Sequence, residues 1–214
     1  MISELELGPE SLVLEVACND GYLLKNFVSN NIPCFGVEPT ESTAQQAAKL
    51  GIPVLQKFFG KALGEKLANQ GQLCDLIIGN NVYAHVPDIN DFTAGLKLVL
   101  KTHGVITLEF PHLMRLIAGS QFDTIYHEHF SYLSLNAVNQ IFANHGLRIW
   151  RVEELNTHGG SLRVYGCHDN DPRPEESSLR NILKEELVAG LCEIDTYTRF
   201  QTTAEKIKNE LLSF

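Results

Sequence analysis

The sequence predicts a doubly wound α/β fold, in which helices cover both faces of a mainly parallel sheet, followed by a helical extension. Short apolar segments alternate with amphipathic segments over the first 110 residues, which is the pattern of repeated strand–helix units. Right-handed crossovers wind such units into one sheet. Two later strand-like segments with a short link between them predict a closing antiparallel pair, which reverses the last strand.

Five segments are predicted to be buried parallel strands, because each is a short apolar run bounded by turn residues. In chain order they cover residues 11–17, 33–38, 52–56, 73–79 and 104–110. A ligand of such a sheet binds beyond the carboxyl ends of its strands. The residues that follow each strand are therefore the first candidates for a functional site.

Helices are predicted between these strands from cap residues and from apolar positions that recur every three to four residues. They cover residues 21–30, 40–50, 60–70 and 89–101. Gly51 ends the second helix. The fourth helix is amphipathic, with Phe92, Leu96 and Val99 on its apolar side.

The alternation stops after the fifth strand, and residues 111–131 are predicted to form a long polar loop. A helix is then expected near residues 135–144, and the closing pair of strands is expected over residues 147–153 and 161–167. Residues 169–176 are charged and contain two prolines, which is typical of a linker. We therefore expect a first domain over residues 1–170 and a helical extension over residues 171–214.

The composition limits the classes of partner. The formal net charge is −9, and an acidic surface repels nucleic-acid phosphates, so no nucleic-acid partner is expected. There is no signal peptide and no apolar run near the roughly 20 residues that span a bilayer, so no membrane association is expected. The five cysteines are odd in number and lack a CxxC spacing, which favours reduced, mostly buried thiols in a cytoplasmic protein.

The first strand leads into the sequence EVACNDG, residues 15–21. This segment resembles the first motif of class I methyltransferases, in which an acidic residue, here Glu15, precedes alternating glycines. Ala17 and Asn19 replace two of those glycines, and Gly21 keeps the third. Small residues let a cofactor approach the backbone, and Asn tolerates left-handed backbone angles. The resemblance implies S-adenosylmethionine as the cofactor, whereas a purely structural strand–turn–helix is the alternative for this segment alone.

A second acidic residue, Glu38, ends the second strand 23 residues after Glu15. This position predicts that Glu38 accepts hydrogen bonds from both ribose hydroxyls of a cofactor, with Pro39 beside it. A dehydrogenase places its acidic residue similarly, so Glu38 alone does not choose the cofactor. Phe58 and Phe59 follow the third strand and are candidates to flank the adenine, with core packing as the alternative.

Titratable residues concentrate in QFDTIYHEHFSY, residues 121–132, after the fifth strand. Tyr126, His127, Glu128 and His129 are consecutive, and such a cluster at the ligand edge of a sheet favours a functional site. Taken singly, each histidine is more often a surface or core residue than a catalyst. No third metal ligand has a convincing spacing, so we expect no metal site.

Other polar residues follow the later strands. Asn80 and Asn81 end the fourth strand, where methyltransferases line the methionine end of the cofactor, and turn formation is the alternative. Softer candidates for substrate contact are the histidines near the ligand edge, for which a plain turn or surface role is equally open: His85, His112, His127 and His158.

Five segments together carry a closer resemblance: VACNDGYLL, NNVYAHVPDINDF, EFPH, QFDTIYHEHFSYLSL and THGGSLRVY. They resemble the NDP-hexose C-methyltransferases over residues 12–165, and YHEHFSYL is the most specific element. The resemblance implies that this sequence is the cofactor-binding middle domain. It also implies an N-terminal zinc domain and a C-terminal α/β domain, neither of which this sequence contains, so we expect a fragment or a shortened relative.

The resemblance also implies carbon methylation of a nucleotide-linked 4-ketosugar. His129 matches the base of the family, and the near-neutral pKa of histidine suits removal of a proton beside a keto group. Tyr126 matches a position that donates to the developing oxyanion, and Glu128 one that orients an imidazole or contacts the sugar. The alternatives are a small-molecule O- or N-methyltransferase, a cofactor-binding module inactive on its own and, more weakly, an NAD dehydrogenase.

Overall fold

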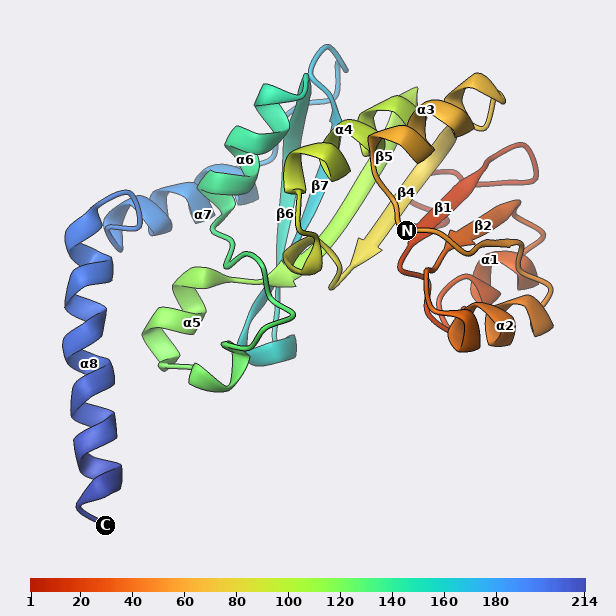
Figure 1. The fold of residues 1–214 in the computed structure, drawn as a ribbon. Coiled ribbons are helices and arrows are strands. Elements are labelled where there is room, and N and C mark those ends of the chain that lie inside the picture. Colours follow the sequence, from red (N-terminus) through yellow and green to blue (C-terminus); the bar gives the residue numbers. More distant parts are fainter.

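The computed structural model describes residues 1–214 and contains one seven-stranded mixed sheet between two layers of helices (Figure 1). The strands are β1 (Val13–Val16), β2 (Cys34–Val37), β3 (Val54–Leu55), β4 (Cys74–Asn80), β5 (Leu100–Pro111), β6 (Leu147–Leu155) and β7 (Ser161–His168). Their order is β3-β2-β1-β4-β5-β7-β6. The first five pair in parallel, and β7 is antiparallel to both β5 and β6. The predicted doubly wound sheet with a reversed final strand is confirmed.

Except for α5, the helices lie where the sequence predicts them, most of them with shorter ends. They are α1 (Lys25–Ser29), α2 (Glu41–Lys49), α3 (Lys61–Asn69), α4 (Ile89–Val99), α5 (Leu113–Gly119), α6 (Leu135–Asn144), α7 (Ser177–Val188) and α8 (Ile194–Leu212). Three short 3₁₀ turns are η1 (Tyr83–His85), η2 (Phe122–Thr124) and η3 (Thr157–Gly159). The expectation of a plain loop over residues 111–131 is wrong, because the apolar run of α5 forms a helix that buries Leu116.

A hydrophobic core lies on each face of the sheet. Successive strand residues point to opposite faces, so Leu14 and Val16 of β1 pack in the larger core and Val13 packs in the smaller one. On α4 the expected apolar side is buried, and the carboxylate of Asp88 caps the helix by accepting backbone N–H groups. This packing fixes the strand ends on which the site is built.

The two C-terminal helices differ in how they pack. Leu179 and Ile182 of α7 belong to the larger core, and Glu186 is fully buried. By contrast α8 has no buried residue and projects away from the sheet (Figure 1). The extension expected over residues 171–214 therefore consists of α7, which is part of the packed body, and α8, which is not.

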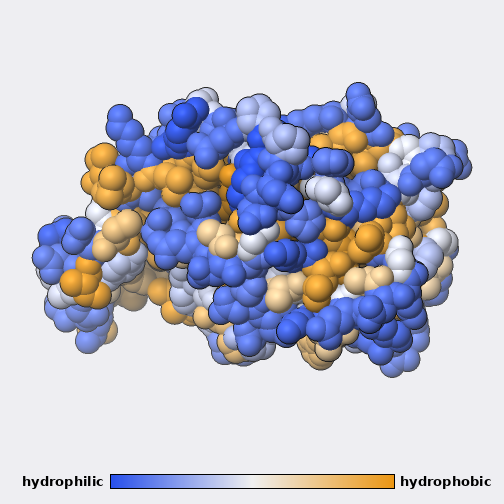
Figure 2. Space-filling view, turned by 90° about the horizontal axis from the view of Figure 1, so that it is seen from above, coloured by the Kyte–Doolittle hydropathy of each residue, from blue (hydrophilic) through white to orange (hydrophobic).

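The face shown in Figure 2 is mostly hydrophilic, with separate apolar patches. Four cysteines are buried and Cys192 is exposed, which confirms the expectation of mostly buried thiols. No helix combines the length and the apolar character needed to cross a bilayer.

Candidate functional site

The turn after β1 has the backbone conformation that its motif predicts. Ala17, Asn19 and Gly21 have φ values of 58°, 50° and 80°, which is the left-handed region that glycine favours. A Cβ at Gly21 would lie 2.5 Å from the side chain of Ile52, so the start of the next helix packs tightly here. Ala17 and Asn19 thus keep the glycine-like turn without its glycines.

Glu38 connects this turn to the end of β2. Its side chain is buried, and its Oε2 accepts the backbone N–H of Asn19 at 3.1 Å while its Oε1 accepts that of Thr40 at 2.9 Å. Each carboxylate oxygen has a second lone pair. Glu38 can therefore accept two further hydrogen bonds, as a ribose diol requires.

Glu15 is an unusual buried carboxyl group on β1. It is 1% exposed, and its Oε2 has no hydrogen-bond partner within the protein. Burial, and then the nearby charge of Asp20, raise its pKa to about 8. A buried unpaired carboxyl group suits a cationic ligand such as the ammonium group of S-adenosylmethionine.

An apolar cleft of about 610 Å³ opens beside these residues. Ala17 and Pro39 line it, and so do Phe58, whose side chain is 85% exposed, and Phe59, which packs edge-on against Phe92 at 5.3 Å. The size and apolar lining are typical of a small-molecule site. Together with Glu15 and Glu38, the cleft fits the methionine, ribose and adenine parts of S-adenosylmethionine.

A second, polar cleft of about 390 Å³ adjoins the first, and His85 lines both. Its walls come from the end of β4, the end of β5, the segment after α5, and the link between β6 and β7. The lining residues are Asn81, Ala84, His85, Pro111, Gln121, Asp123, Thr124, Tyr126, His129, His158 and Gly159. Segments far apart in the sequence thus meet at one edge of the sheet.

His129 has a defined tautomer in this cleft. Its Nδ1 lies 2.7 Å from the carbonyl oxygen of Thr124, and a carbonyl only accepts, so Nδ1 carries the proton and donates it. The Nε2 atom of the neutral ring is then a lone-pair acceptor, and the hydroxyl of Tyr126 donates to it at 3.2 Å. His129 therefore presents a base, with a hydroxyl donor in contact.

His85 lies beside that imidazole, with ring centroids 4.7 Å apart. Burial, and then the adjacent His129, lower the pKa of His85. Two imidazoles so close disfavour a second positive charge. The neutral form of His85 is therefore favoured beside His129.

The segment that carries His129 is fixed at both ends. The carbonyl oxygen of Ala84 accepts the backbone N–H groups of Phe130 and Ser131, at 2.9 and 3.2 Å. Further back in the chain, the amide of Gln121 donates to the carbonyl oxygen of Gly159 at 2.8 Å. These contacts attach the segment to η1 and to the β6–β7 link.

Several predicted site residues lie outside both clefts. His127 and Glu128 are exposed and line neither cleft. His112 is 1% exposed in the core, where its Nε2 contacts Glu186 Oε1 at 2.7 Å. The expectation that His112 follows its strand into the ligand cleft is thus wrong, because α7 provides a buried partner for it.

Of the remaining candidates, two line the polar cleft and Asn80 lies elsewhere. Asn81 and His158 line the polar cleft, and both have left-handed backbones, with a φ of 52° each. Asn80 instead lines a separate cavity of about 360 Å³ under the N-terminal residues. Asn81 therefore combines a turn conformation with a place in the cleft.

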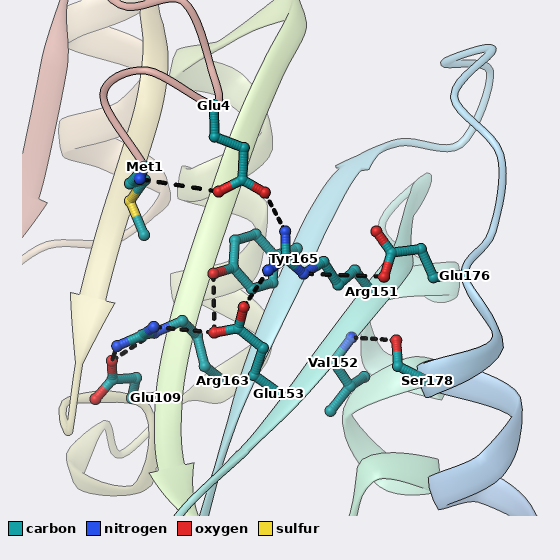
Figure 3. Close-up of polar contacts among 10 residues, drawn as sticks. All are labelled: Met1, Glu4, Glu109, Arg151, Val152, Glu153, Arg163, Tyr165, Glu176 and Ser178. Carbon is teal, nitrogen blue, oxygen red and sulfur yellow. Dashed lines mark hydrogen bonds and ion pairs between the residues drawn. The ribbon is translucent and has the colours of Figure 1, made fainter.

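Sequence reasoning missed a charged network beside that cavity (Figure 3). Arg163 donates to Glu109 at 2.7 Å and to Glu153 at 3.0 Å, and Tyr165 also donates to Glu153. Arg151 extends the network to the N-terminal segment. Glu109 and Glu153 are the register partners of Arg163 on its two neighbouring strands, and this register is not visible in the sequence.

No group of three or more His, Cys, Asp or Glu side chains has the geometry of a metal site.

Comparison with known families gives two matches along the chain. Residues 3–152 match the model of a methyltransferase domain. Residues 156–214 match the model of the C-methyltransferase C-terminal domain. Together the two matches cover nearly all of the chain.

A curated relative is the C-methyltransferase NovU of Streptomyces niveus, 32% identical over 213 residues. The match covers 98% of this chain and 50% of NovU, so the chain spans about half the length of that relative.

Solved structures share the fold at low identity. Magnesium protoporphyrin IX methyltransferase from Synechocystis PCC 6803 with bound SAM has a TM-score of 0.56 at 15% identity, over 75% of this chain and 71% of that one. A chain from the complex between the Haloferax volcanii Trm112 methyltransferase activator and a methyltransferase gives a TM-score of 0.61 at 12% identity. The match covers 78% of this chain and 86% of that one.

Proposed function

Because the chain belongs to the S-adenosylmethionine-dependent methyltransferase family, we propose that it methylates a carbon atom of a nucleotide-linked 4-ketosugar. The observation that carries the proposal is the state of His129, whose Nδ1 is held by the Thr124 carbonyl so that Nε2 is a base in the polar cleft. The C-methyltransferase relative and the C-methyltransferase family model support carbon as the methyl acceptor.

The apolar cleft is the proposed cofactor site. Ala17, Pro39 and Phe58 would hold the adenosyl part, Glu38 the ribose hydroxyls, and Glu15 the charged methionine end. Gly21, Asn19 and Asn81, which follows β4, would complete the site. Bound S-adenosylmethionine supplies an electrophilic methyl group to a nucleophilic carbon.

The protein supplies the acid–base chemistry. A keto group acidifies the C–H bond beside it, and Nε2 of His129 takes that proton while the bonding pair forms the enolate. The imidazolium that results keeps its hydrogen bond to the Thr124 carbonyl, which stabilises the added charge. The enolate carbon is then the nucleophile, and no metal is needed for its formation.

Tyr126 is the proposed donor to the substrate oxygen. Its side chain is 43% exposed and its hydroxyl contacts His129 Nε2. A bound ketosugar would replace that contact, so the hydroxyl turns to the developing oxyanion and frees Nε2. His85 and His158, in the same cleft, are proposed to contact the sugar. For Glu128 and His127 a role with the substrate remains a prediction, because neither side chain lines the cleft.

Further domains are part of the proposal, because this chain matches half of its relative. We propose that an N-terminal zinc domain and a C-terminal domain complete the sugar-nucleotide site. The activity test therefore uses both this chain and a full-length enzyme that contains it.

We expect the His129→Ala variant to bind S-adenosylmethionine with the affinity of the parent protein and to lose about 100- to 10,000-fold in turnover, the range for removal of a general base. Calorimetry measures the cofactor affinity, and NMR with a ¹³C-methyl donor and the ketosugar measures the product. His103→Ala is the matched control, because His103 is exposed and lies in neither cleft.

A new C-methyl signal from the parent protein supports carbon methylation, whereas an O-methyl or N-methyl signal contradicts it. Unchanged turnover in the His129→Ala variant would exclude His129 as the base. If both this chain and the full-length enzyme bind the cofactor without turnover, the protein is a cofactor-binding module and the proposed activity is refuted.

A further inference from the structure

We propose that helix α8 positions the base, through stacking of Phe200 on Phe122. The inference rests on the proposed role of His129 and adds two positioning residues that touch neither cleft. Phe122 belongs to η2 and Phe200 to α8, 78 positions further along the chain, and their rings stack with centroids 5.6 Å apart at an angle of 25°.

A short chain of contacts connects this stack to the imidazole. Phe122 and Thr124 are the two ends of the same 3₁₀ turn. The carbonyl oxygen of Thr124 is the acceptor that holds Nδ1 of His129 at 2.7 Å. A shift of η2 therefore moves the one group that fixes which ring nitrogen carries the proton.

Hydrogen bonds hold the start of the turn, where Gln121 donates to the Gly159 carbonyl and the Thr124 hydroxyl donates to the Gln121 carbonyl, but no buried side chain anchors it. Asp123 and Ile125 on either side of Thr124 are exposed, and η2 contains no buried residue. Phe122 is half-buried, and its stack on Phe200 is the aromatic contact of the turn. Offset or tilted stacking of this kind is worth more than the apolar area alone.

The face of α8 that meets the body is narrow. Thr196, Phe200 and Ala204 are its only partly buried residues, and their spacing of four puts them on one side of the helix. Phe200 is the large side chain among them. The projecting helix thus meets the body through the ring that supports η2.

The experiment measures the tautomer of His129 directly. Long-range ¹H–¹⁵N NMR of histidine-labelled protein distinguishes a ring protonated at Nδ1 from one protonated at Nε2. In the parent chain we expect His129 to be protonated at Nδ1. In the Phe200→Ala variant, and likewise in Phe122→Ala, we expect the Nδ1–H form to lose its dominance as the Thr124 carbonyl moves.

Two variants control for helix stability and ring chemistry. Leu211→Ala removes a 75%-exposed apolar side chain from the same helix and should leave the His129 spectrum unchanged. Phe200→Tyr keeps an aromatic ring and should restore the Nδ1–H form. The double variant Phe122→Ala/Phe200→Ala should shift the His129 tautomer population no further than either single variant, because the two single variants remove the same contact.

A His129 spectrum in Phe200→Ala identical to that of the parent overturns the proposal, as does an equal change in Leu211→Ala. Affinity for S-adenosylmethionine should stay at the parent value throughout, because the cofactor cleft does not include η2 or α8. In an active full-length enzyme we expect turnover of Phe200→Ala to fall about 10- to 100-fold. The tautomer experiment needs no turnover, so it remains decisive if the proposed reaction fails.

Discussion

At the scale of single residues, the cofactor side of the site combines a buried carboxyl group with a strained turn. Glu15 has an oxygen without a partner, and Ala17 and Asn19 hold left-handed backbone angles. Such features cost stability and persist where the surrounding structure enforces them. Here Glu38 enforces the turn by accepting the N–H of Asn19. These costs mark the place where a ligand is expected to compensate for them.

Glu15 should make the ligand-free protein less stable as the pH rises. The folded protein keeps the Glu15 proton up to a pKa of about 8, while the unfolded chain releases it near 4.5. Between these values the unfolded state binds fewer protons, so the free energy of unfolding falls with pH, by roughly 5 kcal/mol over the whole range. The contribution is complete below pH 4.5 and lost by pH 8.

The Glu15→Gln variant tests this sign, because it removes the titration and keeps the shape. Urea unfolding at pH 5 and pH 8 should show a smaller loss of stability for the variant than for the parent protein. Glu10→Gln, at an exposed site, should follow the parent. An equal loss of stability between pH 5 and pH 8 in Glu15→Gln and in the parent would show that Glu15 is ionised in the folded protein.

At the scale of elements, one buried carboxylate joins three segments. Glu186 of α7 accepts the backbone N–H groups of Leu135 and Asn136, the first residues of α6, and it also contacts Nε2 of His112. A carboxylate at a helix N-terminus satisfies otherwise unpaired N–H groups and the helix dipole. Glu186 therefore places α6 and the residue that precedes α5.

Replacement of Glu186 by leucine should cost about 3–5 kcal/mol, because it leaves two buried donors and one partly buried donor without an acceptor. Urea unfolding measures the loss. Glu185→Leu is the matched control, since Glu185 is exposed and its one ion partner, Arg115, is 4.0 Å away; it should stay within about 0.5 kcal/mol of the parent. Equal effects at the two positions would contradict the role of Glu186.

The elements differ in how far the sequence predicts them. Local patterns predicted the strands, the buried side of α4 and the left-handed Asn19, because each depends on neighbouring residues. The burial of His112 depends on Glu186, 74 positions away, and the network of Arg163 depends on the register of three strands. Such long-range pairings have no local signal, so they became visible only in the fold.

At the scale of the whole molecule, the packed body ends after α7. Leu179 and Ile182 lie in the larger core and Glu186 supports α6, whereas α8 buries no residue. The division expected after residue 170 stays a prediction, and the packing leads us to propose a division near residue 190 instead. Phe200 would then be a contact between the body and a neighbouring element.

Truncation distinguishes the two divisions. A chain of residues 1–192 should unfold within about 1 kcal/mol of the full chain, because it keeps the core, including the buried Leu191. A chain of residues 1–170 should lose several kcal/mol, since two buried aliphatic side chains are each worth roughly 1.5–3 kcal/mol. Thermal unfolding followed by circular dichroism compares them. A stable 1–170 chain would place the division where the sequence suggested it.

The two adjoining clefts draw on different parts of the chain. The apolar one is built from residues 16–92 and Phe130, whereas the polar one owes most of its wall to residues 111–129 and to the link between β6 and β7. The reversed β7 is what brings that link to the same edge. From the proposed roles of the two clefts, we expect an exchange of residues 156–160 with those of a relative to change which molecule is modified and to leave the affinity for the methyl donor intact.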